Sequence, residues 1–278
     1  MKKILLATSA LVATAGVAAA DVSVSGTARM GLVYNDAWAD EVQFDNRVRI
    51  WFNASGETDG GLGWGAKVRI QRDDQGGGAV NNNAVWISGS WGKLTFGDVD
   101  SADKAIVGQI AGVGYTGLGD LNEVDYKADS TAPSAALYEY SAGDFKAALS
   151  AAQPSNADVY AVGLSYSTDT WSIAAGYGVD NASHEVTVKG SVMFGDTTVT
   201  ALYQDDSALA DAFVGVSLEH TFGATDVAVF YDDNHGTDRY GIGASYDLGG
   251  SATLAGGVAY NDVGTGNTVA DLGIKFSF

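Results

Sequence analysis

From residue 21 onward, apolar and polar residues alternate along most of the chain. In the first segment, one parity carries only apolar or small residues: Val22, Val24, Gly26, Ala28, Met30, Leu32 and Tyr34. Side chains two residues apart lie on the same face of a β-strand, so the pattern predicts a strand with one apolar and one polar face. No stretch after residue 20 approaches the roughly 20 apolar residues that a membrane-spanning helix needs.

Similar segments follow one another to the end of the chain. The alternation and the turn residues between segments predict about 16 strands. They cover residues 22–34, 42–54, 62–73, 84–90, 93–97, 137–141, 145–152, 159–167, 171–179, 185–194, 197–204, 212–222, 227–232, 239–248, 252–261 and 268–278. The connections alternate between tight turns, such as Gly195-Asp196, and longer acidic loops, such as Asp205-Asp206. This arrangement is typical of bacterial outer-membrane barrels.

The polar face of the early strands carries positive charge that a protein core would not accept. Its basic residues are Arg29, Arg47, Arg49, Lys67 and Arg69. Because unpaired charge is costly to bury, this face is predicted to line a water-filled lumen and the apolar face to contact lipid. Aromatic residues near the strand ends of the apolar face fit the level of the lipid headgroups. The predicted fold is all-β, a 16-stranded antiparallel transmembrane β-barrel.

The first 20 residues differ from the rest. Met1-Lys2-Lys3 precedes an apolar run that ends in small residues at Ala20, and these are the features of a secretory signal peptide. The alternative is a transmembrane helix, for which the run is short. We expect cleavage after Ala20, which leaves residues 21–278 as the barrel.

Composition and motifs argue against several classes of function. The formal net charge of −19 disfavours nucleic acid as a partner, and the absence of cysteine excludes thiol chemistry. The three histidines, His184, His220 and His235, show neither metal-ligand nor catalytic spacing, so no enzyme is predicted. Residues 112–117 match a dinucleotide-binding fingerprint in letters only, since the strand before it and the helix after it are missing.

Residues 98–136 form the one long segment without a strand pattern. A loop of this length is usually functional, and we expect it to fold into the lumen as a constriction. Its acidic residues are Asp98, Asp100, Asp103, Asp120, Glu123, Asp125 and Asp129. Facing the five basic residues across a narrow opening, these acids would create a transverse field that filters solutes by charge. The alternative is a solvated set of charges without a role in selectivity.

Some of the acids have a second interpretation. Asp98, Asp100 and Asp103 are candidates for a Ca²⁺ site, because this hard cation prefers carboxylate oxygens. The simpler alternative, which we favour, is that Asp100 or Ser101 caps a short helical turn beginning near Ala102. No other cofactor is predicted. The acid pairs of the outer loops are candidates for bridging divalent cations to lipopolysaccharide phosphates, but we favour the alternative that they are solvated loop acids.

Several stretches together resemble the Rhodobacter-type (alphaproteobacterial) general porins. The matching stretches are residues 26–32, 47–50, 65–74, 97–100 and 270–276, together with the predicted signal peptide and the terminal Phe278. The resemblance implies a trimeric 16-stranded barrel for passive diffusion of small hydrophilic solutes, with an acidic inward loop facing basic residues of the wall. In this chain the loop also contains Lys104 and Lys127.

We therefore expect an outer-membrane general diffusion porin. Its partners would be the lipid bilayer, lipopolysaccharide, small hydrophilic solutes and ions, and two further copies of the chain. The excess of acids predicts a mild preference for cations, which the basic residues of the wall oppose. An alternative is a structural or adhesive barrel whose lumen is plugged by residues 98–136.

Overall fold

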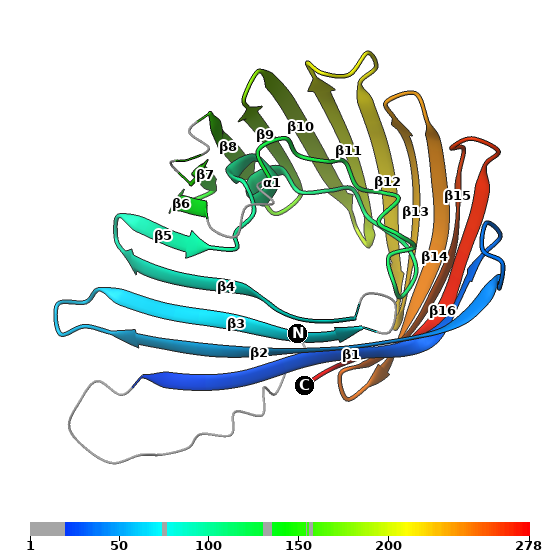
Figure 1. Cartoon of the computed structure of the whole chain (residues 1–278), viewed down its shortest axis with the longest axis horizontal. Coiled ribbons are helices and arrows are strands. Elements are labelled where there is room, and N and C mark those ends of the chain that lie inside the picture. The colour runs from blue at the N-terminus through cyan, green and yellow to red at the C-terminus, as the bar shows by residue number, and fades with distance from the viewer. Residues whose placement is uncertain (1–19, 74–76, 130–134, 154, 156–157) are drawn as a thin grey trace.

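Sixteen antiparallel strands close into a barrel, as the sequence predicts (Figure 1). The computed structural model describes residues 20–73, 77–129, 135–153, 155 and 158–278. Each strand pairs with its neighbours in the chain, and the first strand pairs with the last to close the ring. The predicted signal peptide, apart from Ala20, lies outside the described residues.

The elements follow one another without any crossing of strands. The first five strands are β1 (Asp21–Asn35), β2 (Val42–Glu57), β3 (Gly63–Asp73), β4 (Gly77–Gly89) and β5 (Gly92–Gly97). One short helix follows, α1 (Ala102–Val107). The next strands are β6 (Ala135–Ala142), β7 (Phe145–Ala152), β8 (Val159–Ser167), β9 (Trp171–Asp180), β10 (Ser183–Phe194) and β11 (Thr197–Asp206). The last are β12 (Phe213–Phe222), β13 (Thr225–Asn234), β14 (Asp238–Gly249), β15 (Ala252–Asn261) and β16 (Asn267–Ser277).

The strand register keeps the two faces of the wall distinct. Ala28 of β1 lies opposite Val48 of β2, and the next residue, Arg29, lies opposite Arg47. The outward apolar side chains stay exposed in the single chain, and Phe44 is 83% exposed. An apolar surface of this extent matches lipid rather than water.

Several strand boundaries differ from the prediction by a few residues, and two of these differences bear on the lumen. β4 begins at Gly77, well before the expected residue 84, because its first half is rich in Gly and Asn and shows no alternation. A register shift between Lys67 and Arg69 of β3 interrupts the pairing at the same place. β6 begins at Ala135, so the predicted loop end at residue 136 falls inside a strand.

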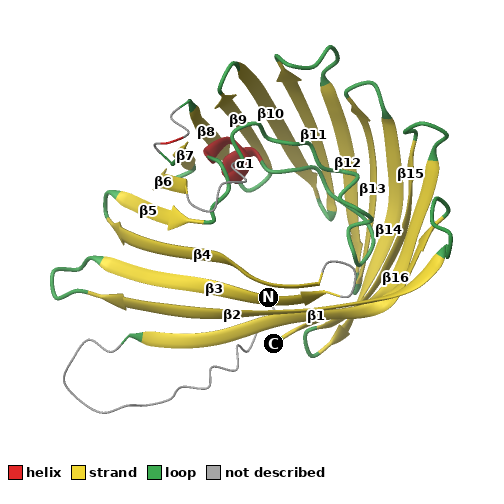
Figure 2. Cartoon of the chain, in the orientation of Figure 1, coloured by secondary structure: helices red, strands yellow, loops and turns green. Residues whose placement is uncertain are grey.

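Residues 98–129, which follow β5, run through the inside of the barrel (Figure 2). We call these residues the inner loop. Its buried apolar residues pack against the inside of the wall, where Val107, Ile110 and Val124 join Leu202 and Phe213 in one cluster. The main hydrophobic core therefore lies between the inner loop and the wall. Among the described residues, no helix is long and apolar enough to cross a membrane.

Candidate functional site

The inner loop leaves the wall at a glycine that no other residue could replace. Gly97 ends β5 with φ of +133°, and a Cβ built there would lie 2.1 Å from the carbonyl oxygen of Asn83. The backbone NH of Asp98 then donates to the same Asn83 oxygen at 2.8 Å. This close approach turns the chain from the wall into the lumen.

Helix α1 begins directly after the turn and packs against β7, β8, β9 and β10. Ser101 occupies the N-cap position in extended conformation but makes no capping hydrogen bond with its side chain. Its hydroxyl donates instead to the Asp103 carboxylate. The predicted helical turn near Ala102 is thus present, whereas the predicted side-chain cap is not.

The inner loop then crosses to the far side of the barrel and returns. At its tip, the backbone NH groups of Tyr115 and Thr116 donate to the Asp271 carboxylate of β16 at 3.1 and 2.7 Å. Arg29 of β1 donates from Nη1 to the Thr116 carbonyl oxygen at 3.2 Å. The tip is therefore held at the seam where β1 and β16 close the barrel.

On its return the inner loop is extended and alternates like a strand. Asn122, Val124, Tyr126 and Ala128 are buried, whereas Glu123 and Asp125 are exposed. Side chains of the wall hold this backbone. Gln204 Nε2 donates to the Asp125 carbonyl oxygen and Arg239 Nη2 donates to the Glu123 carbonyl oxygen, both at 2.9 Å. The alternation aims the carboxylates of Glu123 and Asp125 away from the wall.

Burial raises the pKa of the Glu123 carboxyl group, and the negative charge of Asp120 raises it further. Asp120 is itself exposed at the preceding turn, where the Glu123 NH donates to its carbonyl oxygen at 2.9 Å. Three of the predicted acids, Asp120, Glu123 and Asp125, thus form one exposed row on the inner loop.

The acids nearer to α1 have partners within the protein. Lys104 Nζ lies 2.5 Å from Asp129 and 3.4 Å from Asp100. Burial lowers the pKa of Lys104, but the hydrogen bonds and charges of these two carboxylates outweigh burial and raise it overall. Asp98 accepts a hydrogen bond from the Asn82 backbone NH at 2.8 Å.

The prediction that Asp103 faces the lumen is wrong. Asp103 is 0% exposed and lies between α1 and the wall, beside the equally buried Glu185 of β10. The second residue of α1 points to the wall because the helix packs there, a direction that the charge alone does not reveal. Asp98, Asp100 and Asp103 therefore point to different surroundings. The described residues hold no group of three acidic, His or Cys side chains suited to a metal ion, so the Ca²⁺ interpretation gains no support.

The predicted basic residues lie on the wall of β1, β2 and β3. Arg29 lies opposite Arg47 in register, and Arg49 and Arg69 follow on the same face. Arg29 is paired with Asp45, with Nε 2.9 Å from Oδ2. Arg49 donates to Gln71 at 2.7 Å and Arg69 donates to Asn81 at 3.0 Å.

Lys67 is separated from Arg29, Arg47 and Arg49. It lines a recess together with Asp98 and Asp100, whereas Arg29, Arg47 and Arg49 line another. The single basic patch predicted from the sequence is therefore divided between two recesses of the lumen, and Arg69 lines neither of them.

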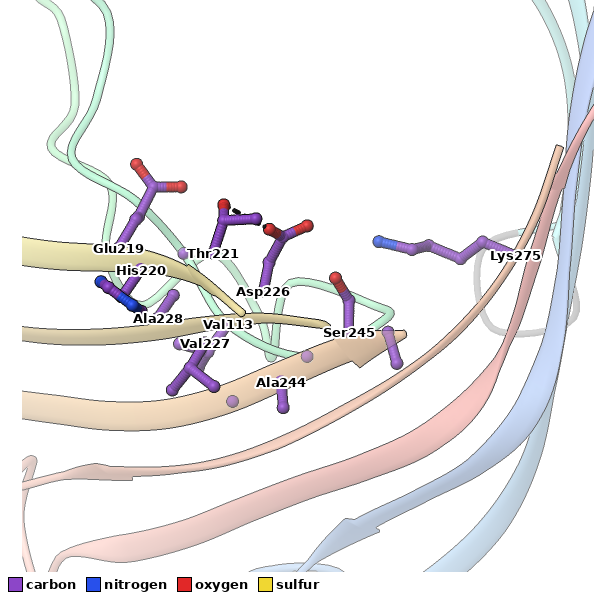
Figure 3. Close-up of a pocket in the computed structure, with 14 residues that line it drawn as sticks. Val113, Glu219, His220, Thr221, Asp226, Val227, Ala228, Ala244, Ser245 and Lys275 are labelled. Atoms are coloured by element: carbon purple, nitrogen blue, oxygen red, sulfur yellow. Dashed lines mark hydrogen bonds between the residues drawn. The ribbon is translucent and has the colours of Figure 1, made fainter. Parts of the chain in front are cut away.

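The sequence analysis missed a basic residue, Lys275 of β16. It lies opposite Arg29 in register and lines the same recess as Arg47 and Arg49. The signal was present, since Lys275 has the lumen parity of the last strand. A further recess on the other side of Lys275 is acidic (Figure 3). There Thr221 donates to Asp226 at 2.7 Å, and Lys275 extends from the opposite wall toward these residues.

Similarity to known proteins agrees with this architecture. The family model of Gram-negative porins matches residues 7–266. The porin of Rhodobacter capsulatus is 32% identical, and the alignment covers 93% of this chain and 100% of that protein. The porin of Fuscovulum blasticum is 28% identical with the same coverage. A solved variant of Rh. blastica porin aligns with a TM-score of 0.82 at 25% identity, again over 93% of this chain and 100% of that chain.

Proposed function

The chain belongs to the family of Gram-negative porins, and we propose that the exposed acids of its inner loop and the arginines of its wall form the charge filter of the pore. The protein is a general diffusion porin of the bacterial outer membrane and not an enzyme. Small solutes cross such a barrel down their own gradient, so the protein acts only through the shape and charge of the lumen.

The observation that carries the filter is the alternation of the returning inner loop. It buries every second side chain against the wall and leaves Glu123 and Asp125 exposed. Arg47, Arg49 and Arg69 lie on β2 and β3, on the lumen face of the wall. Opposed charges across a water-filled opening orient polar solutes and select among ions.

The proposal includes the assembly and export expected from the resemblance. Three copies form a trimer, lipopolysaccharide surrounds the outer rim, and residues 1–20 are removed on export. The exposed apolar face formed by Met30, Leu32 and Phe44 supports contact with another apolar surface. Cross-linking of the detergent-purified protein tests the trimer, and mass determination of its N-terminal peptide tests the cleavage.

Conductance in a planar lipid bilayer tests the pore and its filter together. We expect stepwise, ohmic current increments for the natural protein. In a salt gradient, Glu123→Gln with Asp125→Asn should move the reversal potential toward anion preference. Arg47→Gln with Arg49→Gln should move it toward cation preference, because the opposite charge is then left in excess.

Two outcomes contradict the proposal in different ways. A folded barrel that inserts but conducts no current would mean that residues 98–136 plug the lumen. An open pore whose reversal potential is the same in all three proteins would place the charge filter elsewhere.

A further inference from the structure

The recess between β16, β1 and β2 holds more positive charge than the protein neutralises. Three of its residues are Arg47, Arg49 and Lys275, and Arg29 lies among them. Lys275, Arg29 and Arg47 follow one another in register across three adjacent strands. Directly opposed residues of antiparallel strands have Cβ atoms about 5 Å apart, so these three side chains start from neighbouring positions on the wall.

The carboxylates at this place are already engaged with Arg29. Asp45 lies 2.9 Å and Asp73 lies 4.0 Å from its guanidinium group. Across the described residues, no salt bridge involves Arg47, Arg49 or Lys275. The hydrogen-bond acceptor of Arg49 is the neutral side chain of Gln71. Like charges held this close repel one another, and a bound anion would relieve the repulsion.

The other residues that line the recess indicate a ligand that is larger than a simple inorganic ion. Trp51 lies two residues after Arg49 on the same face of β2 and also lines the recess. Thr27, Thr253 and Ser277 add hydroxyl groups. Guanidinium groups bind phosphate oxygens in bidentate fashion, and aromatic rings stack on sugars and bases.

We propose that this recess is a binding site for phosphate monoesters inside the pore. Arg47, Arg49 and Lys275 hold the phosphate group, and Trp51 contacts the organic part of the solute. The site raises the local concentration of such solutes at the pore wall and makes the pore favour them over neutral solutes of equal size. This inference rests on the proposed function, because a solute reaches the recess only through an open pore.

Single-channel recording tests the site. The bath contains a chloride salt, and inorganic phosphate or adenosine monophosphate is added to it at constant ionic strength. Both should reduce the chloride current of the natural protein in a saturable way, with adenosine monophosphate acting at lower concentration. Arg49→Gln and Lys275→Gln should each raise the half-blocking phosphate concentration about tenfold, equivalent to about 1.4 kcal/mol. Trp51→Ala should remove the advantage of adenosine monophosphate and leave the phosphate effect unchanged.

Lys146→Gln is the matched control. Lys146 is an exposed basic residue of β7, outside the lining of the recess. The variant loses one positive charge, as Lys275→Gln does, and should keep the half-blocking concentration of the natural protein.

The possible failures are distinguishable. A protein that carries no current in chloride alone contradicts the proposed function. A conducting protein whose current is insensitive to phosphate overturns the site. An equal shift in Lys146→Gln and Lys275→Gln also overturns it, since the effect then follows net charge rather than the recess.

Discussion

The wall beneath the inner loop and the wall that the loop leaves bare are made of the same alternating strands but are stabilised differently. The covered wall, β7 to β13, presents glycines and buried apolar side chains such as Phe213 to the loop. The bare wall, β2 and β3, presents long cationic side chains such as Arg47, Arg49 and Arg69 to the lumen. Strand alternation decides only which side chains face inward. Whether those side chains become core or pore lining depends on where the inner loop lies.

The polar residues of the two walls differ in the same way. On the covered wall they hold the loop, as when Lys127 of the loop pairs with Asp206 of β11 at 2.9 Å and donates its NH to Glu185 at 2.8 Å. On the bare wall, within the part of the chain that the structure describes, Arg49 and Arg69 donate hydrogen bonds to the neutral side chains of Gln71 and Asn81. Buried polar groups need partners, whereas lumen cations are solvated and remain available to solutes.

The largest effect on stability is expected from a larger side chain placed where α1 packs against the covered wall. A Cβ at Gly163 of β8 would lie 2.5 Å from the Ala102 carbonyl oxygen. Gly163→Val should therefore displace α1 and destabilise the protein by about 1–3 kcal/mol, the usual cost of overpacking. Thermal unfolding in detergent and channel conductance would both record the change.

Gly190→Val is the control for this comparison. Gly190 is also a strand glycine, but the nearest heavy atom to its Cβ position is 4.0 Å away. Its variant should unfold close to the temperature of the natural protein. Equal loss of stability in the two variants would mean that the contact with α1 does not distinguish the covered wall.

An intermediate effect is expected where the loop tip meets the seam of the barrel. Asp271→Asn removes the charge from an acceptor of two backbone NH groups and the Thr116 hydroxyl. Hydrogen bonds to charged groups contribute about 1.5–3 kcal/mol, so the tip should detach more often. Single-channel current should then fluctuate more than in the natural protein. Asp247→Asn, at an exposed turn far from the loop, serves as the control, and equal fluctuation in both would argue against the anchor.

The smallest effect is expected from protonation of Glu123. Because burial and Asp120 raise its pKa, this carboxylate gains a proton at a higher pH than an ordinary glutamate. Lowering the pH from 7 then removes one negative charge from the loop, and the reversal potential moves toward anions. Glu123→Gln lacks this charge at every pH. The difference in reversal potential between the two proteins should be largest at neutral pH. As the pH falls, this difference should begin to shrink while the pH is still above ~4.3, the ordinary pKa of glutamate.

A constant difference between the natural protein and Glu123→Gln from pH 7 to pH 4 would contradict this assignment. The other nearby charges, Lys104, Asp125 and Asp100, are present in both proteins and cancel in the comparison.

Much of the architecture follows from local pattern. Alternation identified the barrel and its strands, and it assigned Arg29, Arg47, Arg49 and Arg69 to the inner face. The absence of alternation identified the inner loop. These properties depend on neighbours in the chain, because the direction of a strand side chain changes with each residue. Where glycine and asparagine hide the alternation, as at the start of β4, the prediction failed.

Charge pairing and the burial of individual side chains depend on contacts between segments that are distant in the sequence. Closure of β1 on β16 brings Lys275 beside Arg29, two residues that are 246 positions apart in the chain. Packing of α1 on β8 to β10 buries Asp103, although its sequence neighbours Asp100 and Lys104 reach water or each other. Asp45 neutralises Arg29 and leaves Arg47 and Arg49 without an ion pair among the described residues. Charge pairing depends on distances across the fold, and no spacing within one strand contains those distances.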